Sequence, residues 1–229
     1  MKTSTAIGTL IALALTGASA NAQVMFNDEF SSDWTPTAMP GQFTSGATTG
    51  FTVWPLNGSG DMDAGFYSVV TRAHDLHSQF SNSLDANNNV EGRYAIYNGF
   101  SNQDGDAYII RLTNLTPGGQ YELSAATLTL APNPPYPQIS LIRFLHNGAA
   151  LSSDETLLPV PSGQETWTVY ARTFIATGDD TLVIRNLGSA SDAGNDFGLD
   201  NIMVSAVPAP GAAAMLGLGG LMVARRRRK

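Results

Sequence analysis

The stretch 166–186 reads TWTVYARTFIATGDDTLVIRN and holds two runs of β-branched and aromatic residues. The turn-forming tetrapeptide TGDD at 177–180 lies between them. Runs of this composition, bounded by Gly and Asp, are typical of β-strands. Neither run carries apolar residues at the 3.6-residue period of a helix for more than two turns. The stretch therefore predicts two strands joined by a short turn.

The same pattern extends outward through the chain. Turn signals such as Asn147-Gly148 separate further short apolar runs. Six such runs lie at residues 65–70, 92–97, 107–112, 120–130, 138–145 and 197–204. About eight strands spaced by turns, with no internal repeat, predict an all-β fold, a β-sandwich of the jelly-roll type.

The N-terminal residues 1–22 have the layout of an export signal. Lys2 supplies a positive charge, residues 6–15 are an apolar run, and Ala18-Ser19-Ala20 offers a small-residue cleavage site. The apolar run is shorter than the ~20 residues that span a bilayer. We therefore expect passage through the Sec translocon and removal of residues 1–22 by signal peptidase.

The C-terminal residues 207–229 combine three features in a fixed order. Val207, Pro208, Ala209 and Pro210 precede a Gly-rich apolar segment, 211–224. The chain then ends on a basic cluster, which consists of Arg225, Arg226, Arg227, Arg228 and Lys229. As a helix the apolar segment reaches only ~21 Å, against a hydrocarbon core of ~30 Å. The five charges are expected to stay on the cytoplasmic side of the membrane.

This tail resembles the PEP-CTERM sorting tail of Gram-negative bacteria, with Ala209 in place of the middle Glu. The resemblance implies recognition by an exosortase-type membrane protease, and transient anchoring in the inner membrane through a transmembrane helix. Delivery to the cell surface or extracellular matrix then follows. An ordinary tail anchor is the alternative.

Between these ends, residues 23–206 form the predicted folded body, which is strongly acidic. It has six arginines, no lysine and 19 acidic side chains, a net charge of −13. Nucleic-acid binding requires clustered Lys and Arg, so the composition argues against it. The chain has no cysteine, which excludes disulfides, thiolate catalysis and Cys-ligated zinc.

Several segments of the body carry a recognisable layout. A Pro-Gly loop at 117–119 leads into a Tyr-containing strand, Trp167 begins a strand that ends in Phe174-Ile175-Ala176, and the last strand contains GLDNI at 198–202. Together with FNDEFSSDW at 26–34, this pattern resembles the galactose-binding-domain-like jelly rolls that include many carbohydrate-binding modules. The resemblance covers about residues 24–205 and implies a jelly-roll fold; it does not name a ligand.

That resemblance also implies one structural Ca²⁺ where the first and last strands meet. The positions it points to are Asp28, Glu29, Asp196 and Asp200, with amide oxygens from Asn27 and Asn201. Calcium prefers such oxygen ligands. Turn-capping or buried hydrogen-bonded carboxylates are the alternative. No complete EF-hand loop and no HExxH motif occurs in the sequence.

Sugar binding requires exposed aromatic platforms beside planar polar groups. Trp54 and Tyr136 lie in loop-like, proline-containing contexts, and Arg143 could add a polar contact. We therefore expect these three residues to be the ligand-binding candidates for an extracellular polysaccharide; ordinary loop packing is the alternative for both aromatics.

Catalytic motifs are absent from the sequence: it has no Gly-x-Ser-x-Gly elbow and no local cluster of Glu with flanking aromatics. The leading interpretation is an exported, non-catalytic surface or matrix protein. A purely structural matrix protein without a small ligand and an extracellular carbohydrate-active enzyme are the alternatives. A cleft with two carboxylates of raised pKa would favour the enzyme.

Overall fold

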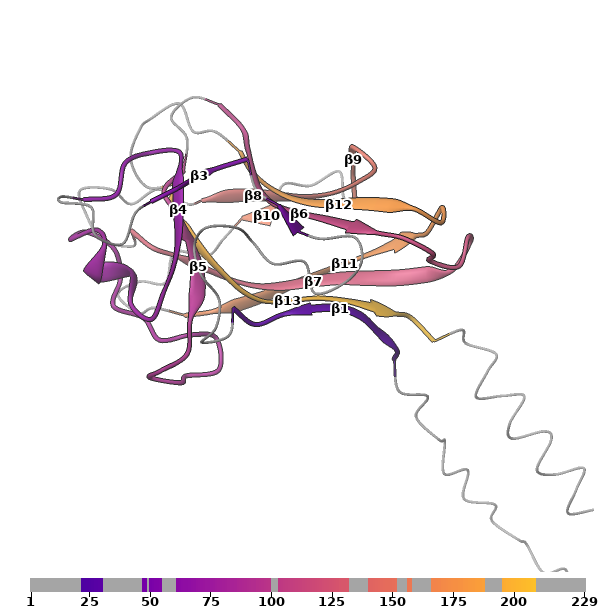
Figure 1. Cartoon of the computed structure of the whole chain (residues 1–229), viewed down its shortest axis with the longest axis horizontal. Helices are drawn as coiled ribbons and strands as arrows, with labels where there is room; N and C mark the ends of the chain where they lie inside the picture. The colour runs from indigo at the N-terminus through magenta and orange to yellow at the C-terminus, as the bar shows by residue number, and fades with distance from the viewer. Residues whose placement is uncertain are drawn as a thin grey trace, which may run out of the picture. The chain divides into compact units, whose positions relative to one another are not determined.

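The computed structural model describes residues 22–30, 47–48, 50–54, 61–99, 103–131, 140–151, 156–157, 166–187 and 195–208. Within these ranges the strands form two stacked sheets, which Figure 1 shows as two layers that run lengthwise through the body. Apart from one short parallel pair, all strand pairs are antiparallel.

The first sheet has its last strand near the centre. In hydrogen-bonding order it runs β11 (Thr168–Ile175), β7 (Gln120–Thr129), β13 (Phe197–Ala206), β5 (Tyr94–Tyr97), β4 (Phe66–Val70) and β3 (Thr52–Val53). Strand β1 (Val24–Asp28) also pairs with β13, along its C-terminal half. Strand β5 pairs with the N-terminal half of β13. Between these two partners β13 has an irregularity at Asp200 and Asn201, where Asn201 has φ 47°.

The second sheet is built around β12. Its order is β10 (Thr156–Leu157), β8 (Leu141–His146), β12 (Asp180–Leu187), β6 (Gly105–Leu112) and β2 (Ala47–Thr48), with β9 (Ala149–Ala150) paired to β8. The turn between β8 and β9 is Asn147-Gly148, with φ values of 49° and 82°. Positive φ at both central residues suits a tight hairpin, and Asn-Gly is the sequence that adopts it most readily.

Alternation along each strand divides the apolar side chains between two clusters. In β5, Ala95 and Tyr97 point into the main core between the sheets, whereas Tyr94 and Ile96 point the other way. The main core includes a stack in which Tyr97 lies 5.0 Å from Phe197, between ring centroids, at an interplanar angle of 9°. Burial of this apolar surface is the principal source of stability in a chain without disulfides.

The second cluster covers the outer face of the first sheet near β4 and β5. It consists of Trp54, Met62, Val70, Ala73, Phe80, Tyr94, Ile96, Leu128 and Leu130. Part of it comes from the segment after β4, which includes the short 3₁₀ helix η1 (Ala73–Asp75). The first sheet is therefore buried on both faces in this region.

The predicted fold class, an all-β sandwich of the jelly-roll type, is confirmed. Each of the eight predicted runs contains a strand, from β4 at residues 66–70 to β13 at residues 197–206. The expected signal and C-terminal helices lie outside the described residues. Among the described residues, the structure has no helix long and apolar enough to cross a membrane.

Candidate functional site

The first predicted metal ligand, Asp28, serves as a link between the sheets. Its Oδ2 accepts a hydrogen bond from the phenolic O–H of Tyr108 on β6, and its Oδ1 accepts one from the backbone N–H of Phe30 at 3.0 Å. Burial raises the pKa of Asp28, and these two hydrogen bonds oppose the rise. Both oxygens of this carboxylate thus have protein donors.

Asp196 directly precedes β13, Asp200 lies within it, and the two have different neighbours. Asp196 accepts the backbone N–H of Gly99 at 3.1 Å, and burial raises its pKa to about 7. Asp200 accepts the N–H of Ala86 at 2.9 Å and that of Asn201 at 2.8 Å. Burial, and to a smaller extent the neighbouring carboxylates of Asp85 and Glu29, raise the pKa of Asp200 to about 7.

The predicted ligands have different hydrogen-bond partners. The carboxylate of Glu29 raises the pKa of both Asp28 and Asp200, and the pKa of Asp200 is also raised by Asp85, a residue that the sequence did not single out. Among the described residues, no group of three or more His, Asp or Glu side chains is arranged to hold a metal ion. The donor set is oxygen-only, as calcium requires, but the arrangement does not fit the predicted site. The calcium ion stays a prediction.

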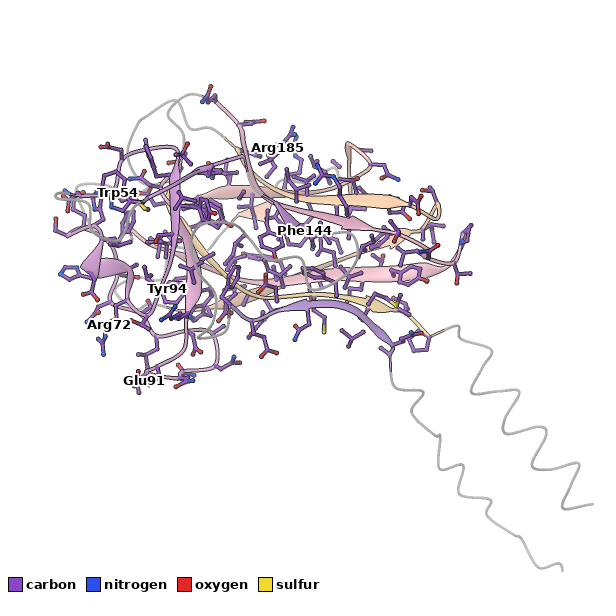
Figure 2. All side chains as sticks on the ribbon, viewed as in Figure 1. Trp54, Arg72, Glu91, Tyr94, Phe144 and Arg185 are labelled. Carbon is purple, nitrogen blue, oxygen red and sulfur yellow. The ribbon has the colours of Figure 1, made fainter. Side chains whose placement is uncertain are left out.

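Two of the three predicted ligand-binding residues, Trp54 and Arg143, are described: Trp54 directly follows β3 of the first sheet, and Arg143 lies in the second sheet. Trp54 is only 9% exposed: its indole meets Phe66 edge-on at 5.2 Å in the second cluster, and its buried Nε1 has no partner among the described residues. Arg143 is half-buried on β8 in the other sheet, opposite Arg185. Tyr136 lies outside the described residues. The expectation that Trp54 is exposed is wrong, because its side chain packs in the second cluster (Figure 2 labels it).

A polar cluster that the sequence reading missed closes one end of the second sheet. Asp180 accepts hydrogen bonds from the backbone of Thr177 and Gly178, from the Thr177 hydroxyl and from Asn147. His146 Nε2 lies 2.6 Å from its Oδ1. Burial alone would raise the pKa of Asp180, but these bonds outweigh it and lower the value to about 2. These hydrogen bonds join the turn at 147–148 to the turn at 177–180, and Asp180 is buried.

A hollow of about 310 Å³ opens beside η1. Its lining comes from the end of β4, from η1 and its neighbours, and from the residue before β5: Val69, Val70, Thr71, Arg72, Asp75, Leu76 and Arg93. The volume is at the low end of the ~300–1,000 Å³ of small-molecule sites. The hollow joins two guanidinium groups, one carboxylate and apolar side chains, so it offers donors, an acceptor and a surface for C–H groups.

Sequence reasoning did not find this hollow because its two arginines are 21 positions apart and belong to no motif. The strand register brings them together, since Val70 of β4 pairs with Tyr94 of β5. Arg93 directly precedes Tyr94 in the sequence. Arg72 follows Val70 after one intervening residue, Thr71. Only knowledge of which residues pair across β4 and β5 would have indicated that the two arginines lie close together.

Of the predicted sorting motif, Val207 and Pro208 are the last described residues. The N–H of Val207 donates to the carbonyl of Gln120 at 2.9 Å, and Pro208 is exposed. Ala209, Pro210 and the basic cluster 225–229 lie outside the described residues.

No family model matches the sequence, and no curated protein does either. Among solved structures, the CBM22-1 xylan-binding domain of Paenibacillus barcinonensis Xyn10C is 11% identical, with 82% of this chain and 97% of that chain covered and a TM-score of 0.42. The C-terminal domain of EclA, a sugar-binding protein, is 18% identical over 48% of this chain and 74% of its own, with a TM-score of 0.39. The K3 cleaved adhesin domain of Lys-gingipain from Porphyromonas gingivalis is 11% identical over 80% and 98%, with a TM-score of 0.41. These similarities identify neither a ligand nor a site on this chain.

Proposed function

We propose that the protein is an exported, non-catalytic protein of the cell surface or extracellular matrix whose body binds a saccharide. The observation that carries the binding part is the hollow beside η1. A sugar presents hydroxyl groups beside an apolar C–H face, and it needs hydrogen-bonding and apolar groups in one concave place. The hydrogen-bonding groups of the hollow are Arg72, Arg93 and Asp75. Its apolar groups include Val70 and Leu76.

The positions of the raised-pKa carboxylates support a non-catalytic role. Glycosidases hold two carboxyl groups ~5–9.5 Å apart across a cleft. Asp196 directly precedes β13 and Asp200 is its fourth residue, and their carboxylates bond to different segments, at Gly99 and at Ala86. Both are buried, at 8% and 1% exposure, and both accept backbone hydrogen bonds. They serve to join loops to β13.

The export and sorting part of the proposal rests on the sequence at the two ends. Residues 1–22 would direct the chain to the Sec translocon, and residues 207–229 would pause it in the inner membrane for an exosortase-type protease. Mass spectrometry of the surface form tests both cleavages. Replacement of Arg225, Arg226, Arg227, Arg228 and Lys229 by Ser should leave the tail uncleaved or the protein released, whereas unchanged processing would contradict the sorting role.

Binding is tested on a glycan array with the purified protein, beside variants at the hollow and at Tyr136. Selective binding to one glycan class that weakens in Arg72→Gln supports the hollow as the site. Binding that weakens only in Tyr136→Ala would place the site at the loop that the sequence indicated. A protein that binds no glycan in any buffer would instead be a structural matrix protein.

Calcium is tested by thermal melts with calcium and with matched magnesium. A rise in Tm specific to calcium, and lost in Asp200→Asn, would support an ion near Asp200 and Glu29. Equal melting in both ions would contradict the calcium prediction. The test is independent of glycan binding, because the proposed role of the ion is structural.

A further inference from the structure

The hollow beside η1 concentrates positive charge in a body that is otherwise acidic. Two of the six body arginines, Arg72 and Arg93, line it, together with one carboxylate, Asp75. The lining of the hollow therefore has two cationic side chains and one anionic side chain, within a body of net charge −13. Under physiological conditions salt screens charges beyond ~8 Å. The acidic body therefore repels a distant anion only weakly, and the two guanidinium groups attract an anion that reaches the hollow.

The arginine backbones are held in place by a buried hydrogen-bond chain. The N–H of Ala73, directly after Arg72, donates to Tyr94 Oη at 3.2 Å, and Tyr94 directly follows Arg93. Tyr94 Oη in turn donates to the carbonyl of Ser83 at 3.2 Å. Ala73 and Tyr94 are both fully buried. One bond thus joins the backbone directly after Arg72 to the side chain of the residue directly after Arg93, at the end of the body where Figure 2 labels Arg72 and Tyr94.

The Arg72 side chain is partly oriented as well. Its Nη1 donates to Asn82 Oδ1 at 3.2 Å, which holds the guanidinium plane while the group keeps further N–H donors. The planar fork of a guanidinium matches a carboxylate in a bidentate way, and such charge-assisted bonds are about twice as strong as neutral ones. A carboxylate is therefore the ligand group that gains most from this fork.

The rest of the lining selects among anions. Asp75 accepts hydrogen bonds and repels a second negative charge, so it suits a ligand with hydroxyl groups and a single charge per unit. Val70 and Leu76 add apolar surface against which the C–H face of a ring can pack. A polyphosphate has neither hydroxyl groups along its chain nor an apolar C–H face. A sugar ring with one carboxylate has both.

We propose that this hollow binds a uronic-acid unit of an extracellular saccharide, with its carboxylate paired to Arg72 and Arg93 and a hydroxyl donating to Asp75. The inference rests on the proposed saccharide-binding function and assigns its ligand class. It predicts that the protein discriminates an acidic saccharide from its neutral ester at this one place.

The test is calorimetric titration of the full-length protein with trigalacturonic acid and with its methyl ester. The ester has the same ring and hydroxyls without the charge. We expect the acid to bind at least about tenfold more tightly than the ester, the equivalent of one charge-assisted hydrogen bond. Arg72→Gln and Arg93→Gln should each abolish this preference, and Arg72→Lys should keep only part of it because an ammonium has no planar fork.

Arg111→Gln is the matched control, because it removes the same charge from an exposed position on β6 in the other sheet. It should leave the preference intact, and thermal melts confirm that each variant is folded. Equal affinity for acid and ester, or an equal loss in the Arg111→Gln variant, overturns the inference. If neutral glycans bind on the array but the acid shows no preference, the inference alone fails; if no glycan binds, the proposed function fails with it.

Discussion

Tyr108 on β6 donates its phenolic O–H to the carboxylate of Asp28 at the end of β1, so that one buried hydrogen bond joins the two sheets across the core. Burial raises the pKa of both groups, that of Tyr108 well above its usual range. Phe26 and Phe30 pack edge-on against the same ring, at 6.3 and 6.1 Å between centroids.

Loss of this bond should destabilise the fold. Tyr108→Phe leaves the ring contacts in place but removes the donor to a buried carboxylate, which costs about 1–3 kcal/mol. Urea unfolding at pH 7 measures the change. In a double-mutant cycle, Asp28→Asn combined with Tyr108→Phe should cost less than the sum of the two single variants, and strict additivity would show that the two groups do not interact.

Asp196 should make the fold less stable as the pH rises through the neutral range. In the unfolded chain an Asp has a pKa of ~3.9, whereas burial holds Asp196 at about 7 in the folded state. Between these values the unfolded chain releases its proton and the folded protein keeps it, so stability falls with pH. We expect the Asp196→Asn variant to lose about 2–3 kcal/mol less than the wild type between pH 4.5 and 7.5. Identical pH profiles in urea unfolding would contradict this.

Asp180 should act in the opposite sense and at lower pH. Its folded pKa of about 2 lies below the unfolded value of ~3.9, so its stabilising effect is complete above ~pH 5 and is lost as the pH falls toward 2. Asp180→Asn should be less stable than the wild type by about 2–3 kcal/mol at pH 7, and the gap should narrow as the pH falls from 5 to 3. A difference in stability between the two proteins that stays constant from pH 5 to pH 3 would mean that the charge of Asp180 has no role. Chemical unfolding at several pH values provides the measurement.

Gly92→Ala should disturb the loop that precedes Arg93. A Cβ at this position would lie 1.8 Å from Asp85 Oδ2, and Asp85 is buried with Oδ1 bonded to the N–H groups of Asn87 and Asn89. We expect a drop in stability of about 1–3 kcal/mol from this overpacking. Gly118→Ala is a contrasting variant: its cost comes from the positive φ of 78° with nothing within 4 Å of the new Cβ. If the hollow binds the acidic saccharide, Gly92→Ala should weaken binding and Gly118→Ala should not.

The longer strands of the eight predicted runs could be predicted because each one carries its own local pattern. The run at 180–186 became β12 (Asp180–Leu187), and Asn147-Gly148 formed the expected turn. The very short strands β2, β3, β9 and β10 have only two residues each, which is too little for a period to be visible. Their pairing depends on neighbours from elsewhere in the chain.

The candidate site was harder to predict because it depends on contacts between distant segments. Trp54 resembles an exposed loop aromatic in sequence, yet the fold places it beside Phe66 in a cluster that no local pattern announces. Arg72 and Arg93 look like ordinary surface charges until Tyr94 and Ala73 are known to meet. Tertiary contacts of this kind are set by strand register, which a single sequence does not display.

The position of β13 has a consequence for the order in which the chain can fold. This strand is the last of the described strands to be synthesised, yet it hydrogen-bonds to β1, β5 and β7, and the N–H of Ala206 donates to the carbonyl of Gln23 at 2.8 Å. The first sheet cannot close until residues 197–206 have been made. If the chain crosses a membrane N-terminus first, as proposed above, the first sheet stays incomplete until residues 197–206 have passed, so the arrival of β13 times the completion of the sandwich.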